Sequence, residues 1–180
     1  MPSFSSTVVV DQPVEKVWEV WSDVRLLPEL SSSTVEVRGA PERLTEVGQS
    51  FEQVVQAVGK CFVSTWTVID IVAEDHLTIE GGVGLGTRYR LTERVESMGP
   101  DRTRLTLEVD YRLPFGPLGR VASKLGIERL ARKEADEVLQ NLATHLLVRD
   151  VVRPLASVRP TDRTGSERPA PMPAASAGRR

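Results

Sequence analysis

Cysteine and histidine are scarce in this sequence, which contains one cysteine and two histidines among its 180 residues. A single cysteine excludes an internal disulfide and every metal site built from several cysteines. Cys61 lies in a run typical of a β-strand, so we expect it to pack as a small apolar residue rather than react as a thiol. His76 and His145 are far apart in the chain and form no metal-ligand set with it. The sequence therefore predicts neither a metal nor a cofactor.

An excess of charge of one sign is also absent from the whole chain, whose formal net charge is −2. Residues 1–150 nevertheless contain 17 basic and 23 acidic residues, whereas residues 151–180 contain six arginines and two acidic residues. This division predicts an acidic folded domain at 1–150 and a basic tail at 151–180. Phosphate contacts need a face rich in lysine and arginine, so we expect no nucleic acid on the folded domain.

Long hydrophobic runs are missing as well. The longest run without a charged residue, Val138 to Val148, has eleven residues and includes Gln140, Asn141 and His145. It is too short and too polar to cross a bilayer, and the N-terminus lacks the basic start and apolar run of a signal peptide. We therefore expect a cytoplasmic protein without a transmembrane segment. The tail has five prolines and no aromatic residue, which predicts disorder, and its spread arginines could contact an anionic surface only weakly.

Hydrophobic periodicity divides residues 1–150 into three parts. An alternating strand that ends at Val10 precedes a short amphipathic helix at 13–22 and a second short helix that Asp23 can cap. Period-two alternation then predicts consecutive strands joined by short turns, an antiparallel meander. A pattern of period 3.6 returns after residue 117, with Gly126 as a potential kink and a long helix at 127–148. The expected strands are 34–38, 50–58, 61–72, 77–80, 87–95 and 103–113.

The order of these elements predicts an α+β fold in which a curved antiparallel sheet of about six or seven strands grips the long C-terminal helix. A sheet of that size must bury one face, and the long helix is the only element large enough to cover it. Two surfaces of such different curvature leave a gap, which we expect to be an apolar cavity. Glycines 81, 82, 84 and 86 are expected to interrupt the sheet as a bulge or loop at the cavity rim.

Three segments of the chain resemble the START-like (SRPBCC) helix-grip superfamily, which includes polyketide cyclase/dehydrase and lipid-transport proteins. They are the opening VVVDQPVEKVWEVWSDVRLLPEL, the segment EVGQSFE, and the ending LPFGPLGRVASKLGIERLARKEADEVLQNLATHLL. The resemblance covers residues 3–148 and implies the helix-grip fold. Family members include aromatase/cyclases, carriers of hydrophobic ligands and hormone receptors. The FGPLG ending is also similar to that of actinobacterial members described as toxins of toxin–antitoxin pairs.

Strand parity predicts which side chains face the cavity. If Tyr89 and Leu91 face inward, Arg88 and Arg90 face water, where cross-strand ion pairs with Glu108 and Asp110 on the neighbouring strand are expected. Parity with Phe51 and Val55 favours Gln53 over Glu52 as a cavity residue, and the side that Trp66 occupies is left open. The residues predicted to contact a ligand are Gln53, Trp66, Tyr89, Leu91, Leu107, Val109, Tyr111, Leu130, Val138 and Leu142.

Candidates for catalysis are few. His76 follows Glu74 and Asp75 in a predicted turn and is expected to be solvated. His145 lies near the predicted end of the long helix, where the helix dipole would stabilise it, although it could also serve as an acid or base at the cavity mouth. Besides His145, only Gln53 and the tyrosines at 89 and 111 could assist a reaction. The catalytic residues, if the protein is an enzyme, are therefore unknown.

The sequence supports three hypotheses for function. The first is binding, with transport or sequestration, of a small hydrophobic ligand such as a lipid or polyketide-like molecule in the cavity. The second is an enzyme with polyketide cyclase, aromatase or dehydratase activity, which the resemblance implies. The third is a toxin-like interaction protein that uses the basic tail. The first is preferred because the inner parity is apolar and no polar residues converge on it.

Overall fold

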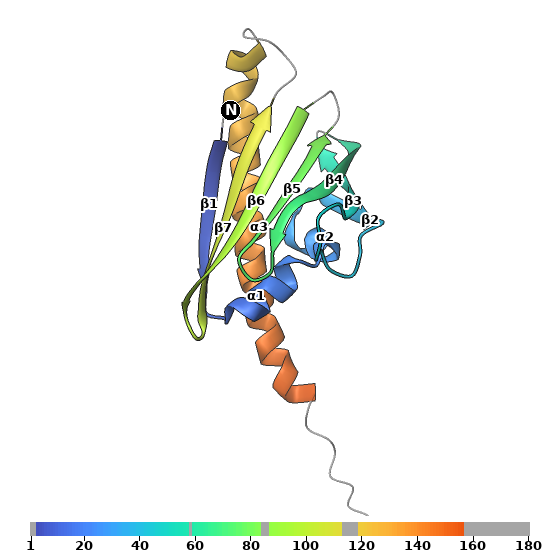
Figure 1. Ribbon diagram of the computed structural model, residues 1–180. Coiled ribbons are helices and arrows are strands. Elements are labelled where there is room, and N and C mark those ends of the chain that lie inside the picture. The colour runs from blue at the N-terminus through green and yellow to red at the C-terminus, as the bar shows by residue number, and fades with distance from the viewer. Residues whose placement is uncertain (1–2, 58, 84–86, 113–118, 157–180) are drawn as a thin grey trace, which may run out of the picture.

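The computed structural model describes residues 3–57, 59–83, 87–112 and 119–156. Seven strands, three helices and one short 3₁₀ helix make up this part of the chain (Figure 1). In chain order they are β1 (Ser3–Val10), α1 (Val14–Trp21), η1 (Val24–Leu26), α2 (Leu27–Leu30), β2 (Thr34–Arg38), β3 (Ser50–Ala57), β4 (Lys60–Val72), β5 (His76–Val83), β6 (Thr87–Gly99), β7 (Arg102–Arg112) and α3 (Gly119–Ala156).

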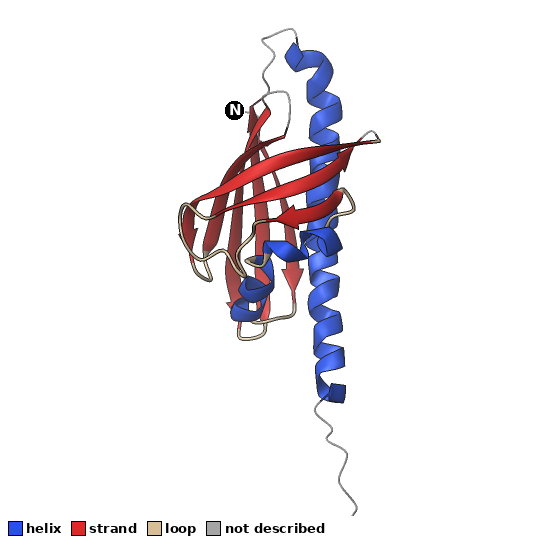
Figure 2. Ribbon diagram, turned by 90° about the vertical axis from the view of Figure 1, so that its right-hand side faces the viewer, coloured by secondary structure: helices blue, strands red, loops and turns tan. Residues whose placement is uncertain are grey.

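The strands form one antiparallel sheet in the order β1-β7-β6-β5-β4-β3-β2. Strands β2 to β7 follow one another as hairpin partners, and β1 joins the far edge by pairing with β7, with Phe4 opposite Val109. The sheet is curved, and α3 runs along one side of it (Figure 2). The predicted helix-grip α+β fold is confirmed, including the two short helical segments after the first strand.

Alternating burial along the strands explains why the chain forms this sheet. In β7 the buried residues Leu105, Leu107, Val109 and Tyr111 alternate with more exposed ones, so one face of the strand packs against the interior. Asp23 caps η1 as predicted, because its side chain accepts a hydrogen bond from the backbone N–H of Arg25 at 3.2 Å.

Two hydrophobic clusters hold the layers together. The larger one joins β1, β6 and β7 to α1 and α3, and includes Phe4, Leu105 and Leu142. The smaller one lies between η1 and the strands β3 to β5, where it includes Phe51 and Val68. The two clusters share the partly buried residues Trp18, Tyr89 and Leu91. The interior is therefore divided rather than packed as one core.

Strand β5 differs from its prediction. The glycine-rich stretch predicts an end at residue 80, but the strand runs through Gly81 and Gly82 to Val83. A Cβ atom on Gly81 would lie 2.5 Å from Cε3 of Trp66, so glycine makes room for the indole on the neighbouring strand. The glycines at 81 and 82 therefore belong to the ladder, and residues 84–86 lie outside the described part of the chain.

Helix α3 is longer than predicted at both ends. It is continuous over 38 residues, about 57 Å, so Gly126 does not split it. It also includes residues 151–156, for which the composition predicts a disordered tail. Residues 157–180, the rest of the predicted tail, lie outside the described residues.

Three expectations about individual side chains are wrong. Cys61 is exposed rather than packed, because its side chain lies on the outward face of β4. His145 lies eleven residues before the end of α3, too far from the C-terminus for the helix dipole to act on it. Arg88 and Arg90 are exposed as expected, but Arg90 pairs with Glu80 on β5.

Glu108 forms its ion pair with Arg94, at 3.6 Å, rather than with Arg88 or Arg90. In the register of the two strands, Asp110 lies opposite Arg90 and Thr92 lies opposite Glu108. Strand β6 therefore pairs with β7 through Arg94–Glu108 and Glu96–Arg104, whereas Arg90 pairs with Glu80 on β5. No helix among the described residues is long and apolar enough to cross a membrane.

Candidate functional site

A cavity of about 680 Å³ lies between the sheet, the segment from α1 to β2, and α3. Its walls are mainly apolar and come from both hydrophobic clusters, for example Ile79 from the smaller one and Leu107 from the larger one. The volume lies within the usual range for pockets that bind drug-sized ligands. The cavity therefore occupies the place at which the curvature of sheet and helix predicted a gap.

Eight of the ten residues predicted to contact a ligand line this cavity. Trp66, whose side the sequence left open, faces inward and is 5 % exposed. Tyr111 and Leu142 do not line it: they are 1 % and 0 % exposed in the larger hydrophobic cluster, where the ring of Tyr111 packs 6.4 Å from that of Tyr89. The eight are Gln53, Trp66, Tyr89, Leu91, Leu107, Val109, Leu130 and Val138.

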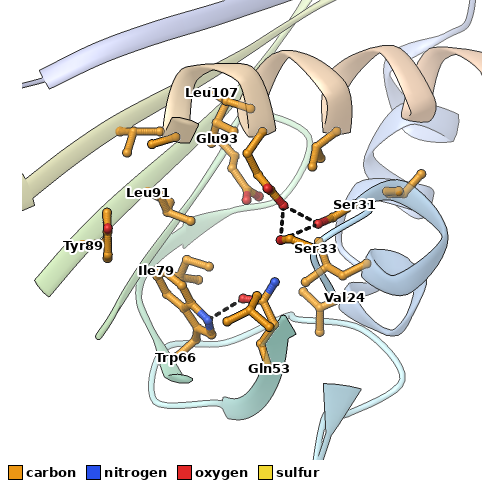
Figure 3. Close-up of a pocket in the computed structure, with 18 of the residues that line it drawn as sticks. Val24, Ser31, Ser33, Gln53, Trp66, Ile79, Tyr89, Leu91, Glu93 and Leu107 are labelled. Atoms are coloured by element: carbon orange, nitrogen blue, oxygen red, sulfur yellow. Dashed lines mark hydrogen bonds between the residues drawn. The ribbon is translucent and has the colours of Figure 1, made fainter. Parts of the chain in front are cut away.

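A chain of hydrogen bonds follows one wall of the cavity from β4 to the α2–β2 turn. The indole Nε1 of Trp66 donates to Oε1 of Gln53 at 2.9 Å (Figure 3). Nε2 of Gln53 donates to Oγ1 of Thr34 at 2.7 Å. The hydroxyl of Thr34 donates in turn to Oγ of Ser31 at 3.0 Å. These bonds fix the orientation of Trp66 and Gln53 before any ligand enters.

The hydrogen-bond chain continues onto α3 at Glu134. Its Oε1 accepts hydrogen bonds from the hydroxyls of Ser31 and Ser33, the latter at 2.5 Å (Figure 3). Glu134 lines the cavity, so the carboxylate is held at the boundary between the helix and the turn. A carboxylate only accepts hydrogen bonds, and the two serine hydroxyls supply two donors to the same oxygen.

Further residues on the same stripe of α3 hold the α2–β2 segment. Oε1 of Glu137 accepts from the backbone N–H of Ser32 at 3.2 Å, and Asn141 donates to the carbonyl of Leu30 at 2.8 Å. His145 continues the stripe with Nδ1 3.6 Å from a carboxylate oxygen of Glu29, and it is not a cavity-lining residue. Contacts at this spacing share one helix face, so they fasten the segment along the cavity edge.

Glu93 is the second carboxyl group of the cavity. It lies on β6, is half-buried, and points into the cavity (Figure 3). Burial raises the pKa of Glu93 to about 8, and the indole N–H of Trp21 opposes part of this rise without reaching hydrogen-bond geometry. The carboxyl group is therefore mainly neutral at pH 7.

The remaining titratable groups of the cavity are Asp23 and Tyr89. The hydrogen-bonded guanidinium of Arg25 lowers the pKa of Asp23, and burial raises the pKa of the Tyr89 hydroxyl. Among the described residues that line the cavity there is no lysine, arginine or histidine. Nor do the described residues include a group of three side chains suited to a metal ion.

Sequence reasoning missed both Glu93 and Glu134, although each carried a signal. Glu93 shares the parity of Tyr89 and Leu91, which were assigned to the inner face of the sheet. Glu134 stands four residues after Leu130 and four before Val138 on the inner stripe of the helix. A charged residue at an inward position of an otherwise apolar pattern was the clue in both cases.

The polar groups give this cavity a limited chemical repertoire. Its apolar walls favour a hydrophobic molecule, while Gln53, Tyr89, Glu93 and Glu134 can orient polar atoms of that molecule. A neutral carboxyl group donates one hydrogen bond and accepts another, whereas a carboxylate only accepts. The two glutamates can therefore act as a donor and an acceptor in the same cavity.

Comparison with known proteins gives one family and several structures. Residues 1–147 match the family described as polyketide cyclase/dehydrase and lipid transport. No curated protein matches the chain. The ZhuI aromatase/cyclase from Streptomyces sp. R1128 superposes with a TM-score of 0.70 at 17% identity, covering 83% of this chain and 95% of that one.

Two further structures share the fold. The protein TTHA0849 from Thermus thermophilus gives a TM-score of 0.68 at 18% identity and covers 82% of this chain and 99% of the other. A START superfamily protein from Mycobacterium smegmatis gives 0.53 at 20% identity, covering 77% and 97%. These likenesses concern the fold. The start of the FGPLG ending, at residues 115–118, lies outside the described residues.

Proposed function

Because the chain belongs to the polyketide cyclase/dehydrase and lipid transport family, we propose that it binds a small hydrophobic ligand, such as a lipid or a polyketide-like molecule, between the sheet and α3. The cavity of about 680 Å³ carries this proposal. It is lined mainly by apolar side chains that the surrounding sheet and helix hold in place. Filling it would remove apolar surface from water, at about 0.8 kcal/mol for each CH₂ group buried.

The rigid wall supports the same proposal. Trp66, Gln53 and Thr34 are linked by hydrogen bonds of 2.9 and 2.7 Å, so this side of the cavity is formed in advance. A preformed pocket costs a ligand less ordering entropy than one that must be assembled on binding. Transport or sequestration would follow from such binding, depending on how the ligand is released.

Native mass spectrometry of the protein purified from its own host tests the proposal directly. We expect a co-purifying apolar molecule, and displacement of a fluorescent fatty acid by an extract of the host. Leu91→Trp fills the cavity and should abolish both signals, because Leu91 lines it. Arg88→Trp is the matched control, since it places the same side chain on the exposed face of the same strand. Absence of any ligand, together with no binding of the fluorescent probe, contradicts the proposal.

A second candidate function is a cyclase or dehydratase reaction on a polyketide-like substrate. The observation that favours it is the pair of carboxyl groups Glu93 and Glu134 on the walls of one cavity, one in an apolar setting and one held by hydroxyl donors. Groups whose environments differ in this way can divide the roles of acid and base. In an aldol cyclisation the base removes a proton next to a carbonyl, a carbon–carbon bond forms, and the acid protonates the attacked oxygen.

Turnover of a synthetic poly-β-ketone thioester, followed by mass spectrometry, separates this candidate from pure binding. An enzyme yields a cyclic product at unchanged mass, or at the mass after loss of one water. That product should be lost in Glu93→Gln and Glu134→Gln but retained in Glu137→Gln, whose carboxylate contacts the backbone of Ser32 outside the cavity lining. Binding without any product, at every substrate concentration tested, would exclude the enzyme and leave ligand binding as the proposed function.

A further inference from the structure

The indole N–H of Trp21 is a buried donor without an acceptor. Trp21 ends α1, is 7 % exposed and lines the cavity. Its Nε1 has no hydrogen-bond partner and is shielded from solvent. Almost every buried donor in a folded protein is paired, because an unpaired one loses its bond to water without replacement. An unpaired donor this deeply buried therefore points to a nearby acceptor within the protein that a small movement of side chains would bring into reach.

Glu93 lies next to this donor, and its carboxyl group points into the cavity (Figure 3). The N–H of Trp21 is close enough to act on the Glu93 carboxyl group, although it does not reach hydrogen-bond geometry. No cationic side chain among the described lining residues is available to balance a negative charge on Glu93. In the neutral form, one carboxyl oxygen can accept from Trp21 while the O–H points away from it.

From these positions we infer that Glu93 and Trp21 form a polar subsite for a neutral oxygen acceptor of the ligand, such as the carbonyl of a ketone or an ester. Glu93 donates its O–H to that oxygen, and Trp21 orients the carboxyl group by donating to its other oxygen. This subsite rests on the proposed binding of a hydrophobic ligand and adds to it a requirement on ligand chemistry. A pure hydrocarbon would leave the O–H of Glu93 without an acceptor.

The other titratable groups of the cavity either already have hydrogen-bond partners within the protein or have a different chemistry from a carboxyl group. Glu134 accepts from Ser31 and Ser33, and Asp23 is paired with Arg25. Tyr89 shares β6 with Glu93, and burial raises the pKa of its hydroxyl further above the physiological range. A ligand amine is the competing partner for Glu93, because it would bind the ionised form. The two partners are distinguished by the direction of their pH dependence.

The test compares two planar probes that differ only by a carbonyl group, 9-fluorenone and fluorene, with binding measured by calorimetry. We expect the wild-type protein to prefer fluorenone, and the ratio of the two dissociation constants to change about tenfold in Glu93→Leu, the size of one hydrogen bond. Glu93→Gln should retain most of the preference because its amide N–H still donates. Trp21→Phe should lose part of it. Fluorene binding checks that each variant keeps its cavity.

The infrared carbonyl stretch of bound fluorenone gives an independent readout. It should shift to lower frequency in the wild-type protein and in Glu93→Gln, and return to its value in apolar solvent in Glu93→Leu. Raising the pH from 6 to 10 should remove the preference in the wild type and leave it unchanged in Glu93→Gln, since burial raises the pKa of Glu93 to about 8.

Each alternative outcome has a clear meaning. Equal affinity for fluorene and fluorenone overturns the subsite and leaves the proposed function standing. Binding of neither probe, and of no fluorescent fatty acid, overturns the proposed function and the subsite together. Tighter binding of 9-aminofluorene as the pH rises, lost in Glu93→Gln, overturns the neutral-acceptor subsite in favour of a cation site.

Discussion

Gly81 on β5 lies against the indole ring of Trp66 on β4, so closely that a Cβ atom on Gly81 would be 2.5 Å from Cε3 and 2.7 Å from Cδ2 of the ring. The two residues are register partners in the sheet. The absence of a side chain at 81 therefore allows the indole of Trp66 to turn inward to the cavity wall, where it donates to Gln53.

Substitution of Gly81 by alanine should displace the Trp66 ring and destabilise the protein by about 2 kcal/mol, the usual cost of overpacking. Urea unfolding gives the free energy of unfolding. A change in tryptophan fluorescence that is absent when Trp66 is replaced by phenylalanine reports the displacement of the ring. Glu80→Ala is the control, because it removes only the exposed ion pair with Arg90, which is worth less than about 1 kcal/mol. Equal losses in the two variants would contradict the steric explanation.

Substitution of Gln53 by leucine should cost about 1–3 kcal/mol, because it leaves the buried Trp66 N–H without an acceptor and removes the hydrogen bond that the Thr34 hydroxyl accepts. Equilibrium unfolding in urea measures the change. Gln56→Leu makes the same replacement on the same strand at an exposed residue and should change stability by less than about 0.5 kcal/mol. A loss in Gln53→Leu no larger than in this control would show that the chain of hydrogen bonds contributes nothing to stability.

Glu93 should make the protein less stable as the pH rises. The unfolded chain releases the proton at the ordinary value of 4.5, whereas the pKa of Glu93 in the folded protein is raised to about 8. The folded state therefore holds more protons between these values, and its stability falls across this window by about 2–4 kcal/mol. Glu93→Gln should remove that part of the slope when unfolding is measured at pH 5, 7 and 9. A slope that is the same in wild type and variant would mean that Glu93 titrates normally.

His76 should add a second, narrower dependence on pH. Hydrogen bonds to Asp75 and Asp70 raise the pKa of His76 above its ordinary value of 6.5. Stability from this protonated histidine is complete below 6.5 and is lost as the pH rises through the folded pKa. His76→Gln should flatten the curve just above pH 6.5 and leave the lower part of the Glu93 window intact. Identical curves above pH 6.5 would refute this role.

The strands and helices of this fold could be predicted from the sequence because burial follows their periods. Leu105, Leu107, Val109 and Tyr111 alternate in β7, and parity correctly placed Arg90 on the outside. The end of β5 was predicted wrongly at Gly81, because glycine usually weakens a strand. The ring of Trp66 on the neighbouring strand, which occupies the space of a side chain at 81, explains why glycine is found here.

The cavity was harder to predict than the sheet. Strand parity correctly predicted that Gln53 lines the cavity. It could not predict the hydrogen bonds from Gln53 to Thr34 and from Thr34 to Ser31, because these bonds depend on the conformation of the turn after α2. Glu93 and Glu134 occupy positions that the apolar pattern assigns to the interior. A charged residue at such a position is normally assigned to the surface unless its hydrogen-bond partners are known. Whether an inward residue reaches a cavity or a filled core depends on curvature, which separates Tyr89 from Tyr111.

The pairing of β1 with β7 places the beginning of the domain beside a strand about one hundred residues later, with Ser3 opposite Asp110. Strands β2 to β7 can form as successive local hairpins while the ribosome elongates the chain, but β1 has no partner until β7 has emerged. This long-range closure slows folding and keeps an apolar strand exposed during synthesis. Helix α3, which packs against β1, is made later still. The cavity is thus closed only after its final wall, α3, has been translated, and a nascent chain that lacks α3 leaves the inner face of the sheet open.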